Sequence, residues 1–165
     1  GYSRCLALGA GEKAVAFPMG VWHYLSGDCI SATDWFAKCL PCADELAIAV
    51  IYWHTLCCYR TGRELALLSM YHRDMDVGHH TAYRLVSVFI GETTWEEAAE
   101  RAEKDASDLN AVIALYGLCG YLNHIGQTEQ SAILLKKLLK RDSCWPCISY
   151  LAAWNDEHTR SAENF

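Results

Sequence analysis

Four glycines at regular spacing constrain the fold of this chain more than any other feature: Gly27, Gly62, Gly91 and Gly126. The steps between them are 35, 29 and 35 residues. Each glycine ends an apolar stretch of helical length and is followed by a second helical pattern. Glycine adopts the left-handed conformation that terminates a helix at little cost. One turn glycine per period of about 34 residues predicts stacked helical hairpins, an architecture that usually binds other proteins.

Apolar residues recur at helical spacing through most of the chain, and no segment of useful length alternates apolar with polar residues. We therefore expect an all-α fold, a right-handed superhelical stack of four hairpins and a capping helix. Residues 1–11 are expected to be an N-terminal extension, 12–155 the repeat domain and 156–165 a polar tail. The expected helices are 12–26, 29–40, 44–59, 63–74, 79–90, one opened by a capping box at Thr94-Trp95-Glu96-Glu97, 109–125, 128–141 and 147–154.

Local signals accompany these helices. Asp28 is a favourable N-cap for the second helix, whereas Pro18 should bend the first helix or delay its start. In the helix after Thr94, glutamates precede basic residues by four positions, the favourable order for ion pairs on one helix face: Glu97 with Arg101, and Glu100 with Lys104.

Composition excludes several classes of protein. The chain is 52% hydrophobic and 21% charged, which excludes an intrinsically disordered chain. A net charge of −6 argues against nucleic-acid binding, which needs a basic stripe. The longest apolar stretch, from Leu46 to Tyr59, is too short and too interrupted to span a bilayer. The densest basic run lies in the last turns of one predicted helix, where cations interact favourably with the helix dipole: Lys136, Lys137, Lys140 and Arg141.

The cysteines favour a reducing compartment. There are nine, an odd number, and several lie within apolar patterns, where free thiols behave as small hydrophobes: Cys39, Cys57, Cys58 and Cys119. The start of the sequence has neither a leading methionine nor a long apolar segment, so no signal peptide is visible in it. We expect a cytoplasmic protein and leave a targeting segment upstream of Gly1 open.

A C-x-P-C motif occurs twice, ending at Cys42 and at Cys147, each time before an apolar helix start. A thiol–disulfide site is one interpretation, but such sites place the first cysteine at a helix N-terminus that follows a strand. Zinc is another, with Cys39 and Cys42 joined by His54 or Cys58, which share a helix face. Paired motifs in zinc sites lie roughly 15–20 residues apart, and these lie about a hundred apart. We therefore expect no metal and no cofactor.

The first predicted hairpin has four features at fixed spacing. A large and a small residue stand side by side in its first helix, a turn follows, the second helix has an A-x3-F spacing, and a proline closes the unit: Met19-Gly20, Gly27-Asp28, Ala32 with Phe36, and Pro41. These residues resemble the tetratricopeptide repeat, whose pattern is W-x2-L-G-x2-Y, A-x3-F and P over about 34 residues. The small residues let the two helices approach closely, and the aromatic side chain fills the space between them.

The later units match this pattern less well. In the second, Tyr71 fits the aromatic position, while Thr55 and Leu67 replace the glycine and the alanine. The third is compact and would not be identified alone. In the fourth, four residues fit and Lys136 stands where the aromatic should be: Tyr116, Cys119, Gly120 and Ala132. The resemblance covers most of residues 12–155.

The resemblance implies a protein-binding scaffold. In this family the first helix of each pair lines a concave groove, which here would be formed by Phe17, Val21, Tyr24, Tyr52, Leu56, Tyr59, His79, Val86, Phe89, Gly117, Tyr121 and His124. Members that clamp carboxylate tails of chaperones use basic and amide residues there, whereas Phe17 and Val21 occupy the start of this groove. A hydrophobic or amphipathic helical peptide of a partner protein is therefore expected. The alternative is that many of these aromatic residues are core between repeats.

No catalytic constellation stands out, and we expect no enzyme. The adjacent His79-His80 follow acidic residues, but a polar turn explains them as well, and no phosphate loop, H-E-x-x-H motif or nucleophile elbow occurs. The alternatives left open are a metal- or thiol-dependent sensor that uses the C-x-P-C turns, and the interaction domain of a larger enzyme. Aromatic residues exposed at an end repeat would also permit a homodimer.

Overall fold

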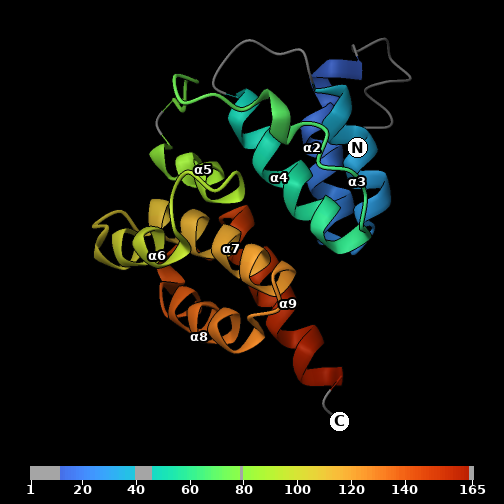
Figure 1. Ribbon diagram of the computed structural model, residues 1–165. Coiled ribbons are helices and arrows are strands. Elements are labelled where there is room, and N and C mark those ends of the chain that lie inside the picture. The colour runs from blue at the N-terminus through green and yellow to red at the C-terminus, as the bar shows by residue number, and fades with distance from the viewer. Residues whose placement is uncertain (1–11, 40–45, 79, 164–165) are drawn as a thin grey trace. The chain divides into compact units, whose positions relative to one another are not determined.

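The fold is all-helical, as expected from the sequence. The computed structural model describes residues 12–39, 46–78 and 80–163, and these contain α-helices, short 3-10 helices and turns but no strand. The chain divides into two compact units, Gly1–Gly78 and His79–Phe165, which are described separately below (Figure 1).

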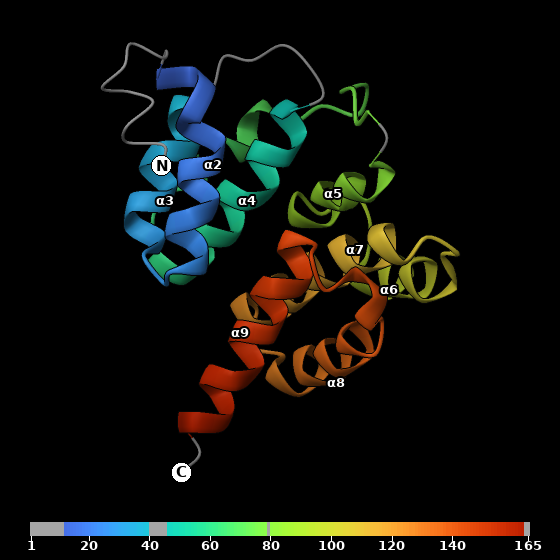
Figure 2. The same ribbon diagram turned by 180° about the vertical axis from the view of Figure 1, so that it is seen from behind.

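The first unit contains three helices, α2 (Glu12–Leu25), α3 (Cys29–Lys38) and α4 (Leu46–Thr61). α2 and α3 form a hairpin, and α4 packs against α3 (Figure 2). α2 continues through Pro18. α4 is buried from Ala47 to Cys58 on every side, as its nearly uninterrupted apolar sequence predicts.

The four turn glycines all adopt the left-handed conformation, with φ between 72° and 86°. At three of them the following residue donates its N–H to the carbonyl five positions earlier, which is a Schellman cap: Asp28 to His23, Glu92 to Ser87, and Gln127 to Leu122. At the fourth, the N–H of Gly62 itself donates to Cys58, a simpler cap. The left-handed conformation predicted at each of the four glycines is confirmed. Gly78, with φ 57°, is a fifth such position that the spacing did not indicate.

The chain after Gly62 corrects the helix predicted for 63–74. Within this range only Leu68–Met70 is helical, as the 3-10 turn η1. The Arg63 side chain donates to Thr33 Oγ1 and Asp34 Oδ1, both at 2.9 Å, so it draws the chain against α3. Leu68 is buried. These contacts with other helices outweigh the local helical preference of the segment, and the second predicted hairpin has no second helix.

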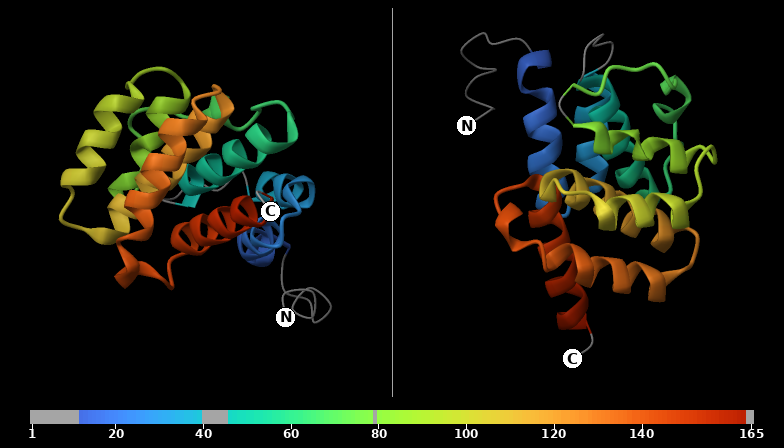
Figure 3. Two further views of the ribbon diagram at one scale, coloured as in Figure 1. Left: turned by 90° about the horizontal axis from the view of Figure 1, so that it is seen from below. Right: turned by 90° about the vertical axis from the view of Figure 1, so that its left-hand side faces the viewer.

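The second unit is organised around α7 (Asp108–His124), which contacts most of its other elements. Figure 3 shows α7 and α8 as an antiparallel pair with α9 beside them. The remaining elements are η2 (Thr81–Leu85), α5 (Val86–Phe89), α6 (Trp95–Lys104), α8 (Thr128–Leu139), η3 (Asp142–Cys144) and α9 (Ile148–Glu163).

Two predicted helices of this unit have different extents. The range 79–90 is not one α-helix, because Thr81–Leu85 is a 3-10 segment whose N-terminus has no side-chain cap. The last helix continues past Trp154 to Glu163, so the predicted boundary at 155 is not a helix end.

Predicted caps and ion pairs are present. Asp28 accepts from the N–H of Ser31 at 3.0 Å, and Thr94 accepts from the N–H of Glu97 at 3.3 Å. Both ion pairs predicted on α6 form: Arg101 with Glu97 at 3.6 Å, and Lys104 with Glu100 at 2.7 Å.

Part of the basic run at the end of α8 makes tertiary contacts as well as lying near the helix dipole. Arg141 donates to Asp108 Oδ1 at 2.8 Å and to the backbone carbonyls of Asp105 and Glu103 at 3.0 and 2.9 Å. Lys137 pairs with the Glu103 carboxylate at 2.7 Å. These bonds fasten the end of α8 to the junction between α6 and α7. No helix in the described residues is long and apolar enough to cross a membrane.

Candidate functional site

The hairpin of α2 and α3 has the close approach that its sequence predicts. A Cβ atom placed on Gly20 would stand 2.5 Å from Phe36 Cε1, so only glycine fits there. Phe36 is fully buried and its ring centroid lies 5.9 Å from that of Phe17. In the hairpin of α7 and α8, Ser131 Oγ donates to the Cys119 carbonyl at 3.0 Å, and Cys119 Sγ contacts the Ser131 carbonyl at 3.5 Å. The first hairpin is therefore closed by a glycine against an aromatic ring, and the second by hydrogen bonds of small side chains.

Most residues predicted to line a groove lie in the core. Tyr24 contacts Trp53 edge-on, with ring centroids 5.2 Å apart. The Arg60 guanidinium lies over the Tyr24 ring, 5.0 Å from its centroid. The groove prediction is therefore corrected for the buried members, because aromatic residues at helical spacing serve equally as core. The buried members are Val21, Tyr24, Tyr52, Leu56, Val86, Phe89 and Gly117.

The remaining groove residues are divided between the two units. Phe17 and Tyr59 are partly exposed in the first unit. In the second unit, Tyr121 is partly exposed and packs against Phe89 with ring centroids 6.3 Å apart, and His124 is exposed. His79 lies outside the described residues.

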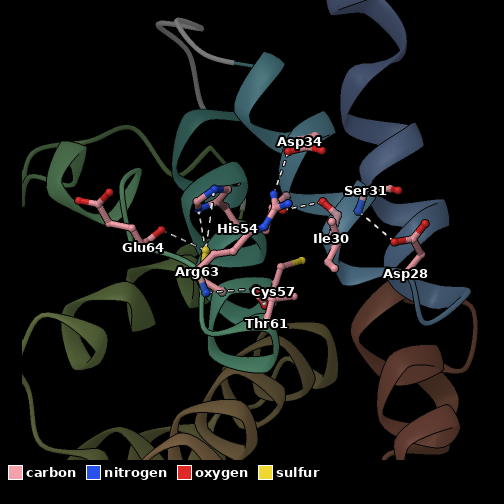
Figure 4. Close-up of polar contacts among 11 residues, drawn as sticks. Asp28, Ile30, Ser31, Asp34, His54, Cys57, Thr61, Arg63 and Glu64 are labelled. Carbon is pink, nitrogen blue, oxygen red and sulfur yellow. Dashed lines mark hydrogen bonds and ion pairs between the residues drawn. The ribbon is translucent and has the colours of Figure 1, made fainter.

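A polar cluster joins α3, α4 and the segment after α4 (Figure 4). Cys58 Sγ lies 3.6 Å from His54 Nδ1 and 3.4 Å from the carbonyl oxygen of Glu64. His54 and Cys58 therefore share a helix face, as their spacing of four predicts. Arg63 completes the cluster through its bonds to Thr33 and Asp34.

The chemistry of this cluster is structural rather than nucleophilic. Burial raises the pKa of Cys58 to about 11, so the thiol is protonated at neutral pH and is a poor nucleophile. Burial, followed by the charge of Arg63, lowers the pKa of His54, so its imidazole is held neutral. In the described residues, no group of three or more His, Cys, Asp and Glu side chains is placed to hold a metal ion.

The zinc hypothesis is only partly covered by the structure, because Cys42 lies outside the described residues. The second C-x-P-C motif is fully described: Cys144 ends η3, Cys147 precedes α9, and both thiols are partly exposed. The other cysteines in the described part of the chain lie in the core: Cys29, Cys39, Cys57, Cys58 and Cys119.

The outward face of α9 is the feature that sequence reasoning missed. Its inner face carries the buried residues Ser149, Tyr150, Ala152 and Ala153. Its outer face carries Leu151, 37% exposed, and Trp154, 46% exposed.

Neighbouring residues extend this exposed face. Residues three or four positions apart share a helix face, so Leu151, Trp154 and His158 form one stripe. The Trp154 and His158 rings are stacked, with centroids 3.5 Å apart. Trp145, in the turn before α9, is 65% exposed. We call Trp145, Leu151 and Trp154 the α9 surface. The sequence signal for it was present within the predicted helix 147–154, where Leu151 and Trp154 fall on the face opposite Ala152 and Ala153.

No protein-family model, curated protein or solved structure matches this chain. The fold therefore defines a class, an all-α protein that contains packed helical hairpins.

Proposed function

We propose that this protein is an interaction scaffold of tetratricopeptide-like character, and that the α9 surface binds an amphipathic helix of a partner protein. The observation that carries the proposal is the exposure of large apolar side chains at the α9 surface: Leu151 and Trp154 on one helix face, and Trp145 in the turn before α9. Large apolar side chains left in water are unfavourable unless a partner covers them, and exposed apolar patches mark interaction sites. Tryptophan is enriched among the residues that dominate binding energy.

The repeat resemblance supports the same function. Schellman-capped hairpins and the Gly20–Phe36 close approach are features that stacked helical repeats share. In such arrays, an end helix with an apolar outer face continues the stacking surface, and a partner helix placed there would pack as the next element does.

The chemistry of the partner follows from the surface. The exposed Leu151 and Trp154, three residues apart on one helix face, suit contact with the apolar anchors of an amphipathic helix. The chain carries a net charge of −6, so a partner helix with basic flanking residues is favoured in association. The partly exposed thiols and buried Cys57, Cys58 and Cys119 accord with our expectation of a reducing, cytoplasmic setting.

A selection experiment tests this function. The full chain is used to select binders from a display library of amphipathic helical peptides with lysine-rich flanks, and each binder is measured against Trp154→Ala. We expect a loss of affinity of at least ~10-fold, because a buried tryptophan anchor is worth about 2 kcal/mol or more. Trp22→Ala is the matched control, because Trp22 is also exposed, at 57%, but lies on α2 in the other unit.

Two outcomes would contradict the proposal. One is a set of binders whose affinity Trp154→Ala leaves unchanged, or no binders at all. The other is concentration-dependent dimerisation of the chain that Trp154→Ala abolishes, since that would assign the α9 surface to a second copy of this chain. Analytical ultracentrifugation of the wild-type chain and of Trp154→Ala separates this case from partner binding.

A further inference from the structure

The second C-x-P-C motif forms a closed turn between η3 and α9. Cys144 is the last residue of η3, and Trp145 follows it with φ −52° and ψ −29°. The N–H of Cys147 donates to the carbonyl of Cys144 at 2.8 Å, which closes a four-residue turn. The carbonyl of Cys147 in turn accepts from Leu151 at 3.0 Å, so Cys147 stands at the start of α9.

This geometry brings the two cysteines to the spacing of a disulfide. A β-turn holds its end Cα atoms less than about 7 Å apart. Disulfides form across Cα separations of roughly 4.4–6.8 Å. The two thiols also interact electrostatically. Burial is the main cause that raises the pKa of Cys144, and the charge of the neighbouring Cys147 thiolate raises it further.

Contacts on both sides hold the turn in place. Ser143 Oγ donates to Asp108 Oδ2 at 2.8 Å, and the same carboxylate is bound by Arg141. After the turn, Tyr150 OH donates to the carbonyl of Leu139 at 3.0 Å. The turn is therefore fixed to α7 before it and to α8 after it.

Accessibility distinguishes this pair from the other described thiols. Cys144 and Cys147 are partly exposed, whereas Cys57, Cys58 and Cys119 are buried. Burial raises the pKa of Cys119 to about 12, so it has almost no thiolate at neutral pH. An oxidant in solution can therefore reach the turn pair and not the core thiols.

We propose that Cys144 and Cys147 are a reversible dithiol site that exchanges with low-molecular-weight disulfides such as oxidised glutathione. The site is independent of the function proposed for the α9 surface. It needs no enzyme-like activation, only two accessible thiols at the two ends of one tight turn.

The exchange balances as a two-electron reaction. The thiolate of one cysteine attacks a sulfur of the glutathione disulfide, the S–S bond of glutathione breaks, and one glutathione leaves as a thiol. The second cysteine then attacks the protein sulfur of the mixed disulfide, and the second glutathione leaves. Two protein thiols are oxidised to one disulfide, glutathione disulfide is reduced to two thiols, and these take the two protons that the cysteines lose.

Peptide mapping tests the site in the intact protein. The reduced full chain is incubated with excess oxidised glutathione, remaining thiols are alkylated, and the chain is digested with trypsin. Cleavage after Arg141 and Arg160 yields residues 142–160, whose only cysteines are Cys144 and Cys147. Cleavage after Lys104 and Lys136 yields residues 105–136, which contain only Cys119 and serve as an internal control.

We expect the peptide 142–160 to lose two hydrogens and to escape alkylation. This oxidation should be at least ~10-fold faster than modification of Cys119, and dithiothreitol should restore both thiols. Cys144→Ser should instead retain a glutathione adduct at Cys147, because the second attack is then impossible. Two free thiols in residues 142–160 after oxidation of the wild-type chain would overturn the proposal. So would stable glutathione adducts on both wild-type cysteines, or disulfides between chains in place of the internal one.

Discussion

Gly20 on α2 and Phe36 on α3 are in direct contact, and the absent side chain of the glycine is what allows it. A Cβ atom at residue 20 would lie 2.5, 2.6 and 2.9 Å from three atoms of the Phe36 ring. The ring is fully buried and has no room to retreat. The distance between the two helices of this hairpin is therefore set by one glycine and one aromatic ring.

Replacing Gly20 with alanine should destabilise the protein by about 1–3 kcal/mol, the usual cost of overpacking a core. A loss of stability would identify the close contact as its cause, because alanine in a helix is otherwise more favourable than glycine by up to about 1 kcal/mol. Urea denaturation followed by circular dichroism measures the change. Gly20→Ala combined with Phe36→Leu should be less destabilised than the sum of the single variants, since leucine frees the space that Cβ needs. A stabilised Gly20→Ala would show that the helices do not approach this closely.

Replacing two aromatic residues on α2 with alanine should change the stability of the protein by very different amounts. Tyr24 is buried against Trp53, so Tyr24→Ala should cost about 3–5 kcal/mol through the cavity it leaves. Trp22 lies two residues away and is mostly exposed, so Trp22→Ala should change stability by less than about 1 kcal/mol. Thermal unfolding of both variants provides the comparison. Equal losses would contradict the packing described for α2.

Arg141 should contribute more to stability than other basic residues near the end of α8. Arg141→Ala removes hydrogen bonds to the carbonyls of Asp105 and Glu103 and to the Asp108 carboxylate, and we expect a loss of about 1–3 kcal/mol. Lys140→Ala, an exposed neighbour, is the control. The loss in Arg141→Ala should shrink as pH falls through the pKa of Asp108, which hydrogen bonds from Ser143 and then Arg141 lower below its usual value. Denaturation at neutral and acidic pH checks both parts, and a loss that grows in acid would refute the assignment.

His54 should make the protein less stable as pH falls through the range in which histidine titrates. Burial lowers its pKa in the folded chain below the usual 6.5, so the unfolded chain binds more protons. Stability is then complete above pH 6.5 and declines as pH falls below it. The slope should be reduced in His54→Gln and kept in His124→Gln, whose side chain is exposed. Urea denaturation between pH 7.5 and 5 measures the slope of stability against pH in each variant. The same slope in His54→Gln as in the wild-type chain would contradict the burial of a neutral imidazole.

Local sequence signals predicted a large part of this fold because they depend on few neighbours. A left-handed glycine, an Asp or Thr cap and an i,i+4 ion pair are decided within one helical turn, and those expected at Gly27, Asp28 and Thr94 are present. The Gly20–Phe36 approach was also predicted, because its residues occupy matching positions of a repeat pattern.

Features that depend on contacts between distant residues were not predictable. The segment after Gly62 reads as a helix, but Arg63 bonds to Thr33 and Asp34, some thirty residues earlier. Whether Tyr52 or Phe17 faces a partner cannot be decided from spacing, because core and binding stripes have the same period. The α9 surface was missed because the exposure of Leu151 and Trp154 depends on which face of α9 packs against α7 and α8, and spacing does not decide that.

The most direct test of the central claim, that the α9 surface binds a partner helix, is an NMR titration of the six tryptophan indole N–H signals, assigned with single Trp→Phe variants. Titration with a selected amphipathic helical peptide should shift the signals of Trp154 and Trp145 and leave that of Trp22 in place. Shifts confined to Trp22 and to the buried Trp53, with Trp154 and Trp145 unmoved, would contradict the claim.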